Sequence, residues 1–172
     1  MRRRSKNTAS ITAGGLCAAL CVVIIYMSRL LPQLELSMMA ASGILVYVLS
    51  LSWDRLTAFL CYACACVLSF LILPLGEGQI LFTFLFGIYP VIKDSLPGGK
   101  ALNYILKLVI FNLLFLSALK LTELLIYNGP IELPYHVLIV IVLSNAMFAL
   151  YDFVLGYVGN YLYDRLKLVK KN

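Results

Sequence analysis

The sequence contains few charged residues for its length. Only 13% of its 172 residues are Asp, Glu, Lys or Arg, whereas 62% are hydrophobic, and the mean hydropathy is +0.95. Soluble domains are about half apolar and about a quarter charged. The charges here are also segregated, which leaves apolar runs too long for a water-facing surface. The composition therefore excludes a soluble globular domain and predicts a polytopic membrane protein.

Enzyme and nucleic-acid signatures are also missing. The sequence has no Gly-rich phosphate loop, no Gly-x-Ser-x-Gly nucleophile elbow and no His-Glu-x-x-His zinc motif. Its one histidine, His136, lies near the start of a hydrophobic segment, where an interfacial position is expected. The net charge of +6 is spread over the ends and short loops, which is not the basic face that nucleic acid requires. We expect a protein that is not an enzyme and has no cofactor.

Six continuously apolar segments predict helices, because barrel strands would alternate polar and apolar residues. A hydrocarbon core about 30 Å thick needs about 20 helical residues, so the second and fourth segments are expected to be tilted or partly re-entrant. We predict an all-α membrane protein in which residues 1–172 form a single compact bundle. Its six transmembrane helices are expected over residues 9–31, 36–51, 56–75, 80–92, 101–127 and 135–161.

The basic residues predict the orientation of the bundle in the cell membrane. With six spans both termini lie on one side, and because cytoplasmic loops carry the excess of Lys and Arg, that side should be the cytoplasm. The basic tails are expected to contact anionic lipid headgroups. The opposite loops carry Glu35, Glu77, Glu123 and Glu132. The cytoplasmic side would hold 11 of the 14 basic residues: Arg2, Arg3, Arg4, Lys6, Arg55, Lys93, Lys100, Arg165, Lys167, Lys170 and Lys171.

The five cysteines all lie inside predicted helices. Cys61-x-x-Cys64 has the spacing of a redox or zinc site, but a second ligand pair and a supporting histidine are missing. In lipid, cysteine acts as a small and weakly polar packing residue. We therefore expect neither a metal site nor a disulfide framework.

Small residues form a strip on the first helix. Ala9, Ala13, Cys17 and Cys21 recur every four residues. Such spacing lets membrane helices approach closely. Packing within the bundle is the simpler interpretation, and docking of another subunit through Ala9, Ala13 and Cys17 is the alternative.

Polar residues at membrane depth form a second group. Asn145, Asp152 and Gly156 share one face of the last helix, and Lys107 and Asn112 lie at comparable depths on the helix before it. An unpaired charge there costs about 2.5–3.5 kcal/mol on insertion scales, so Lys107 and Asp152 are expected to pair. A clamp between the two helices and a ligand pathway remain alternative roles.

A third group lies at the external helix ends. Arg29 and Lys120 are exceptions to the positive-inside pattern and need a carboxylate partner or an anionic ligand. For Lys120 the simplest partner is Glu123, three residues along the same helix. A pocket that combines a few such polar groups with aromatic residues would suit a small, partly polar solute.

The length, the six segments and the strip on the first helix resemble the substrate-binding S components of energy-coupling factor vitamin transporters. The stretch Phe82–Lys93, with Phe86-Gly87-Ile88-Tyr89-Pro90, is also similar to a motif in small Firmicutes membrane proteins that are like S components. The resemblance implies a six-helix bundle that takes up a vitamin-like micronutrient. It also implies that Ala9-x-x-x-Ala13 docks onto a transmembrane coupling subunit driven by ATPase subunits.

The resemblance also implies a ligand site near the outer face, at the end of the fifth helix and in the following loop. Two other functions compete with transport. One is a non-transporting scaffold of the rod-shape-determining D type, and the other is an intramembrane enzyme, for which Asp152 would be the only well-placed acid. The candidate substrate-binding residues are Arg29, Lys120, Glu123, Tyr127, His136 and Asn145.

Overall fold

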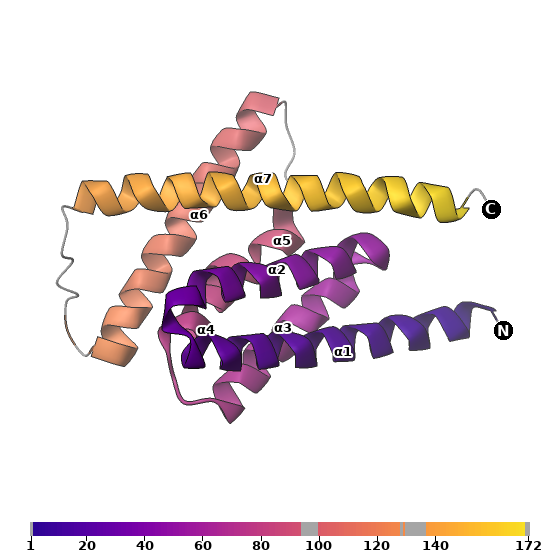
Figure 1. Ribbon diagram of the computed structural model, residues 1–172, viewed down its shortest axis with the longest axis horizontal. Helices are drawn as coiled ribbons and strands as arrows, with labels where there is room; N and C mark the ends of the chain where they lie inside the picture. The colour runs from indigo at the N-terminus through magenta and orange to yellow at the C-terminus, as the bar shows by residue number, and fades with distance from the viewer. Residues whose placement is uncertain (1, 94–99, 128, 130–136, 171–172) are drawn as a thin grey trace.

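A computed structural model describes residues 2–93, 100–127, 129 and 137–170 of the chain, and this part is helical without any strand (Figure 1). The all-α expectation is therefore confirmed over the described ranges. The elements are α1 (Arg2–Leu30), η1 (Pro32–Leu34), α2 (Glu35–Ser52), α3 (Arg55–Ile72), α4 (Glu77–Leu81), η2 (Phe82–Phe86), α5 (Tyr89–Ile92), α6 (Lys100–Thr122), η4 (Glu123–Tyr127) and α7 (Val137–Lys170).

Five of the helical segments are long and apolar enough to cross a membrane. Large apolar side chains cover their outer surfaces, including Leu16 on α1, Leu71 on α3 and Phe153 on α7, which are 66%, 77% and 71% exposed. Apolar surface on this scale is typical of a protein that faces lipid. The five segments are Thr8–Leu30, Pro32–Ser52, Arg55–Ile72, Leu102–Tyr127 and Ile139–Tyr163.

The segment predicted over residues 80–92 is a broken helix. It consists of α4, the π-helical turn η2 and the single turn α5, together only Glu77–Ile92. Gly87 N–H donates to the Phe82 carbonyl at 2.7 Å, and Pro90 stands at the start of α5, where it can make no i−4 hydrogen bond. Gly87 is needed here, because a Cβ would lie 2.6 Å from the Tyr62 ring. Even a straight helix of this length reaches about 24 Å, less than a core about 30 Å thick.

Local residues also change the bounds of the second and third segments. The 3₁₀ turn that begins at Pro32 extends α2 into a helical segment of 21 residues, long enough to cross a membrane, so the prediction of a short second segment is wrong. Asp54 caps α3 by accepting the Thr57 N–H at 3.2 Å. That helix ends at Ile72, earlier than predicted, because Leu73 precedes Pro74 and is extended (φ −101°, ψ 144°).

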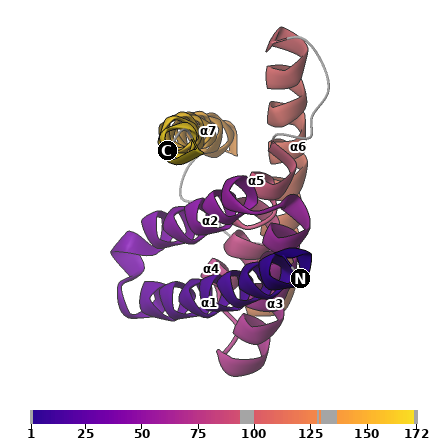
Figure 2. The ribbon, with the colours of Figure 1, turned by 90° about the vertical axis from the view of Figure 1, so that its right-hand side faces the viewer.

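The three N-terminal helices pack together, and α4 contacts all three of them. Figure 1 shows α1 and α2 running alongside each other, and small buried residues such as Ala18, Ala58 and Ala65 fill the contact with α3. The short segment α4–α5 packs against α2 and α6. Figure 2 views α7 almost end-on and α6 from the side, so these two helices cross steeply. The start of α1 and the end of α7 lie at the same end of the molecule (Figure 1).

Candidate functional site

A cluster of charged residues lies where α5, α6 and α7 meet. Asp152 of α7 accepts Lys107 Nζ of α6 at 3.1 Å on Oδ2 and at 3.2 Å on Oδ1. Lys93, directly after α5, places Nζ 2.8 Å from Oδ1 and also donates to the Asp152 carbonyl at 2.7 Å. The Tyr89 hydroxyl donates to Oδ1 as well. The structure thus brings Lys107 and Asp152 together and adds two residues that the sequence reasoning missed.

The cluster holds two lysines and one carboxylate, and all three are largely buried. The side chains of Lys93, Lys107 and Asp152 are 7%, 15% and 17% exposed. Lys93 Nζ also lies 5.6 Å from the centroid of the ring of Tyr47, a residue of α2, so a cation–π interaction partly stabilises the lysine charge. Asp152 therefore holds α5 and α6 to α7, and Lys93 extends the contact to α2.

A second polar contact joins α6 and α7 further along their crossing. Asn112 and Asn145 exchange amide hydrogen bonds at 2.9 and 3.1 Å. Between this pair and the charged cluster, the rings of Phe111 and Phe148 stack with centroids 4.3 Å apart. Asn145 was a candidate substrate-binding residue, and its side-chain amide joins the two helices here.

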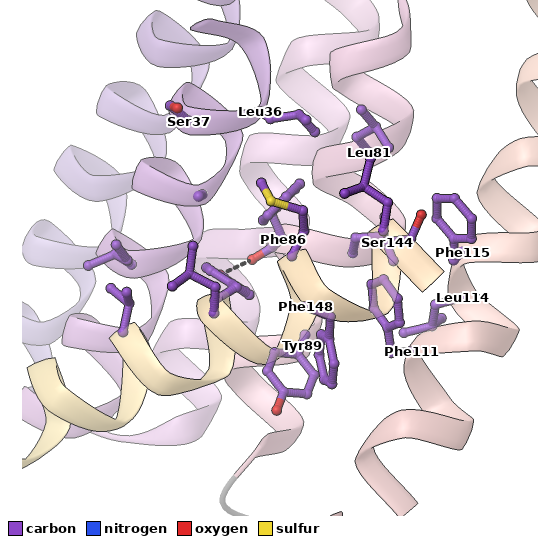
Figure 3. A pocket seen from close by; sticks show the side chains of 18 residues that line it. Leu36, Ser37, Leu81, Phe86, Tyr89, Phe111, Leu114, Phe115, Ser144 and Phe148 are labelled. Atoms are coloured by element: carbon purple, nitrogen blue, oxygen red, sulfur yellow. Dashed lines mark hydrogen bonds between the residues drawn. The ribbon is translucent and has the colours of Figure 1, made fainter. Parts of the chain in front are cut away.

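An apolar cavity of about 360 Å³ lies beside these contacts, between α2, the α4–α5 segment, α6 and α7 (Figure 3). Its size falls in the range of small-molecule sites, about 300–1,000 Å³. Figure 3 shows the rings of Tyr89, Phe111 and Phe148 lying together along one side of it. Tyr151, another lining residue, donates its hydroxyl to the Phe86 carbonyl at 3.1 Å. The lining suits an aromatic or aliphatic molecule with few polar groups.

A smaller cavity of about 200 Å³ adjoins the first at the end of α6. The two cavities share Leu81 and Phe115 in their linings. The polar residues of the smaller cavity include Glu77 and Tyr127, whose hydroxyl donates to Glu77 Oε1. It therefore presents polar groups at one end and apolar side chains toward the larger cavity.

The remaining external candidates do not line either cavity. Arg29 Nη2 donates to Gln79 Oε1 at 3.4 Å, and the side chain of the fully buried Gln79 donates to the Ser69 carbonyl at 2.7 Å. These two hydrogen bonds connect α1 and α4 to the end of α3. Lys120, 80% exposed, pairs with Glu123 at 2.7 Å, the local pair that the spacing favours. His136 lies outside the described residues. Of the five candidates that lie in the described part of the chain, only Tyr127 lines one of the two cavities.

The strip on α1 is divided between two environments. Ala13 and Cys17 pack against the core shared with α2 and α3, whereas Ala9 is exposed. Packing within the chain therefore accounts for Ala13 and Cys17, and Ala9 is the member that remains accessible to another subunit.

One sequence signal could have identified the missed cluster members. Tyr89 and Lys93 are four residues apart and share a face in any helical register, but Lys93 was assigned to a cytoplasmic loop. Gln79 and Glu77 carry no such signal, because their roles depend on how α4 packs.

The fold and the cavities define an all-helical protein with five described helices of membrane-spanning length and an apolar site among them. No protein family, curated protein or solved structure matches the chain.

Proposed function

We propose that the chain is the membrane-embedded substrate-binding subunit of an uptake system for a small, vitamin-like micronutrient. In this proposal the transmembrane coupling subunit and the ATPase subunits are separate chains, as the resemblance to S components implies. The observation that carries the proposal is the aromatic cavity of about 360 Å³ between α2, α6 and α7. A mainly apolar lining with a few polar groups favours a largely apolar ligand.

The proposal places both termini in the cytoplasm and the smaller cavity toward the outside. Supporting this arrangement, the start of α1 and the end of α7 lie at the same end of the molecule, as an even number of crossings requires (Figure 1). The short segment Glu77–Ile92 would then supply the sixth crossing beside five longer helices, and because it is shorter than the hydrocarbon core, the bilayer would have to thin around it. A ligand would enter past Glu77 and Tyr127 and reach the larger cavity by way of Leu81 and Phe115.

A specific observation also supports the scaffold alternative. Lys107, Asp152, Asn112 and Asn145 all form contacts between helices, which is what polar residues do in a protein that only packs and recruits partners. The two functions differ in whether the cavity holds a molecule.

The test is mass spectrometry of small molecules carried by the purified protein and by two variants of α2. Ala40 lines the larger cavity, whereas its neighbour Ala41 is exposed. Ala40→Phe should fill the cavity and abolish the bound molecule, and Ala41→Phe, with the same change in volume, should retain it. A wild-type protein that carries nothing, or equal retention in both variants, would favour the scaffold.

Partner recovery tests the coupling part of the proposal. Purification from the native host should recover a coupling membrane subunit with ATPases, and Ala9→Leu should abolish this recovery. Ala19→Leu is the control, because Ala19 is also exposed on α1 but lies on another face. Recovery of cell-wall machinery from the wild type would contradict the proposal.

A further inference from the structure

Three cysteine thiols meet between α1 and α3, away from both cavities. Cys17 and Cys21 lie one turn apart on α1, and Cys61 projects from α3. The three Sγ atoms all lie within 4.8 Å of one another. Cys21 and Cys61 are almost completely buried, at 0% and 2% exposure, and Cys17 is partly buried.

The close approach of the two helices brings these thiols together. Residues four apart share a helix face, so Cys17 and Cys21 point toward the same neighbour. Small residues allow that neighbour to come close: a Cβ at Gly14 would lie 3.3 Å from Thr57 Cγ2, and Ala58 is fully buried in the same contact. Cys61, one turn after Ala58, thereby supplies the third sulfur.

The geometry fits a three-coordinate sulfur site. Three sulfur ligands at a metal–sulfur distance of about 2.3 Å lie about 4.0 Å from one another. The distances between the three Sγ atoms therefore need to shorten by less than about 1 Å. Their buried surroundings are mainly apolar, with Ala18, Ile25 and Ala65 in the same core cluster. Zinc prefers four ligands, whereas soft sulfur donors at low coordination favour Cu(I).

We propose that Cys17, Cys21 and Cys61 form a binding site for a soft monovalent metal ion of the Cu(I) class. On binding, each of the three thiols loses its proton and forms a thiolate–metal bond, because the thiolate and not the thiol is the metal ligand. One Cu⁺ enters and three H⁺ leave, so binding of the ion tightens as the pH rises. The bound ion links α1 to α3 and is independent of any ligand in the cavities.

The chain supplies matched controls for this site. Cys64 is exposed on α3, and Cys66 Sγ accepts the Thr83 hydroxyl at 3.5 Å. Neither belongs to the cluster, and replacing either leaves four thiols in the chain, as does replacing Cys61.

The experiment is an anaerobic titration of the reduced, detergent-solubilised full chain with Cu(I) alone, in competition with a chromophoric Cu(I) chelator. The wild type and Cys64→Ala should bind one equivalent, and Cys61→Ala and Cys17→Ala should lose it. An equivalent retained in Cys61→Ala, or lost in Cys64→Ala, would overturn the assignment and leave the thiols as packing residues.

X-ray absorption of the wild-type complex gives a reading that does not depend on how the variants fold. A shell of three sulfur atoms supports the site. Fewer sulfurs, or a shell that includes oxygen or nitrogen, overturns it.

Discussion

Asp152 is the residue on which the charged cluster depends most. Asp152→Asn would leave Lys93 and Lys107 facing a neutral amide, although their side chains are only 7% and 15% exposed. Removing one partner from a buried ion pair costs about 3–5 kcal/mol. A single lysine at membrane depth costs about 2.5–3.5 kcal/mol on insertion scales. We expect this substitution to lower the free energy of unfolding by about 3–5 kcal/mol.

Lys107→Met should have a much smaller effect, because Asp152 would keep its second lysine. Lys93 Nζ still lies 2.8 Å from Oδ1, so a neutral ion pair remains. Single polar interactions between membrane helices contribute about 0.6 kcal/mol on average, so we expect a loss of about 1 kcal/mol or less. The double variant Asp152→Asn/Lys107→Met should be more stable than Asp152→Asn alone, because one of its two uncompensated charges is gone.

Unfolding of the detergent-solubilised variants by increasing SDS, followed by far-UV circular dichroism, measures these differences. Lys120→Met is the control: the amine is 80% exposed, and an exposed pair contributes about 0–1 kcal/mol. Equal losses in Asp152→Asn and Lys107→Met would refute the reasoning, because the two lysines would then not share one carboxylate. A loss below about 1 kcal/mol in Asp152→Asn would refute it as well.

Two further predictions concern the packing around the cavity. Gly43→Ala should destabilise the protein by about 1–3 kcal/mol in the same unfolding assay, because a Cβ there would overlap the Phe86 carbonyl oxygen. Gly15→Ala is the control: nothing lies within 4 Å of its Cβ, so this substitution should be neutral or slightly stabilising. Equal losses of stability in the two variants would contradict this account. Asn112→Leu and Asn145→Leu should each destabilise the contact between α6 and α7, because the remaining amide loses its partner on the other helix and keeps only its hydrogen bond to a carbonyl of its own helix. The double variant should recover part of the loss. A double variant whose loss is the sum of the two single losses would show that the amides do not act as a pair.

The long helices were predictable because they depend on the length of apolar runs. The positions of the helix ends were less predictable. Helix α1 begins at Arg2 and α7 extends to Lys170, and both ends lie beyond the apolar runs on which the prediction was based. Lys and Arg are good helix formers, so a helix does not have to end where its apolar residues end. The broken segment around Gly87 and Pro90 was not predictable from hydropathy, which is as high in a π-turn as in a straight helix.

Contacts within one helix pair were easier to predict than contacts among three elements. The Lys107–Asp152 pair follows from the antiparallel order of two adjacent helices and their rise per residue. The cluster of Cys17, Cys21 and Cys61 depends on which face α3 turns toward α1, and sequence spacing does not specify that. The Cys61-x-x-Cys64 motif was misleading, because Cys64 is exposed and the partners of Cys61 lie on another helix.

Tyr89 shows why a helix clamp and a ligand pathway are not exclusive roles for the polar residues. Its ring lines the larger cavity and packs edge-on against Phe148, with centroids 4.9 Å apart, while its hydroxyl donates to Asp152. A ligand that displaces the ring must therefore disturb a carboxylate that also holds Lys107 of α6. Coupling between two sites is reciprocal, so the free energy by which a bound ligand would weaken the clamp equals the free energy by which the intact clamp would weaken binding of that ligand. Under the proposed function the charged cluster would thereby affect ligand binding, even though no described lining residue of this cavity is charged.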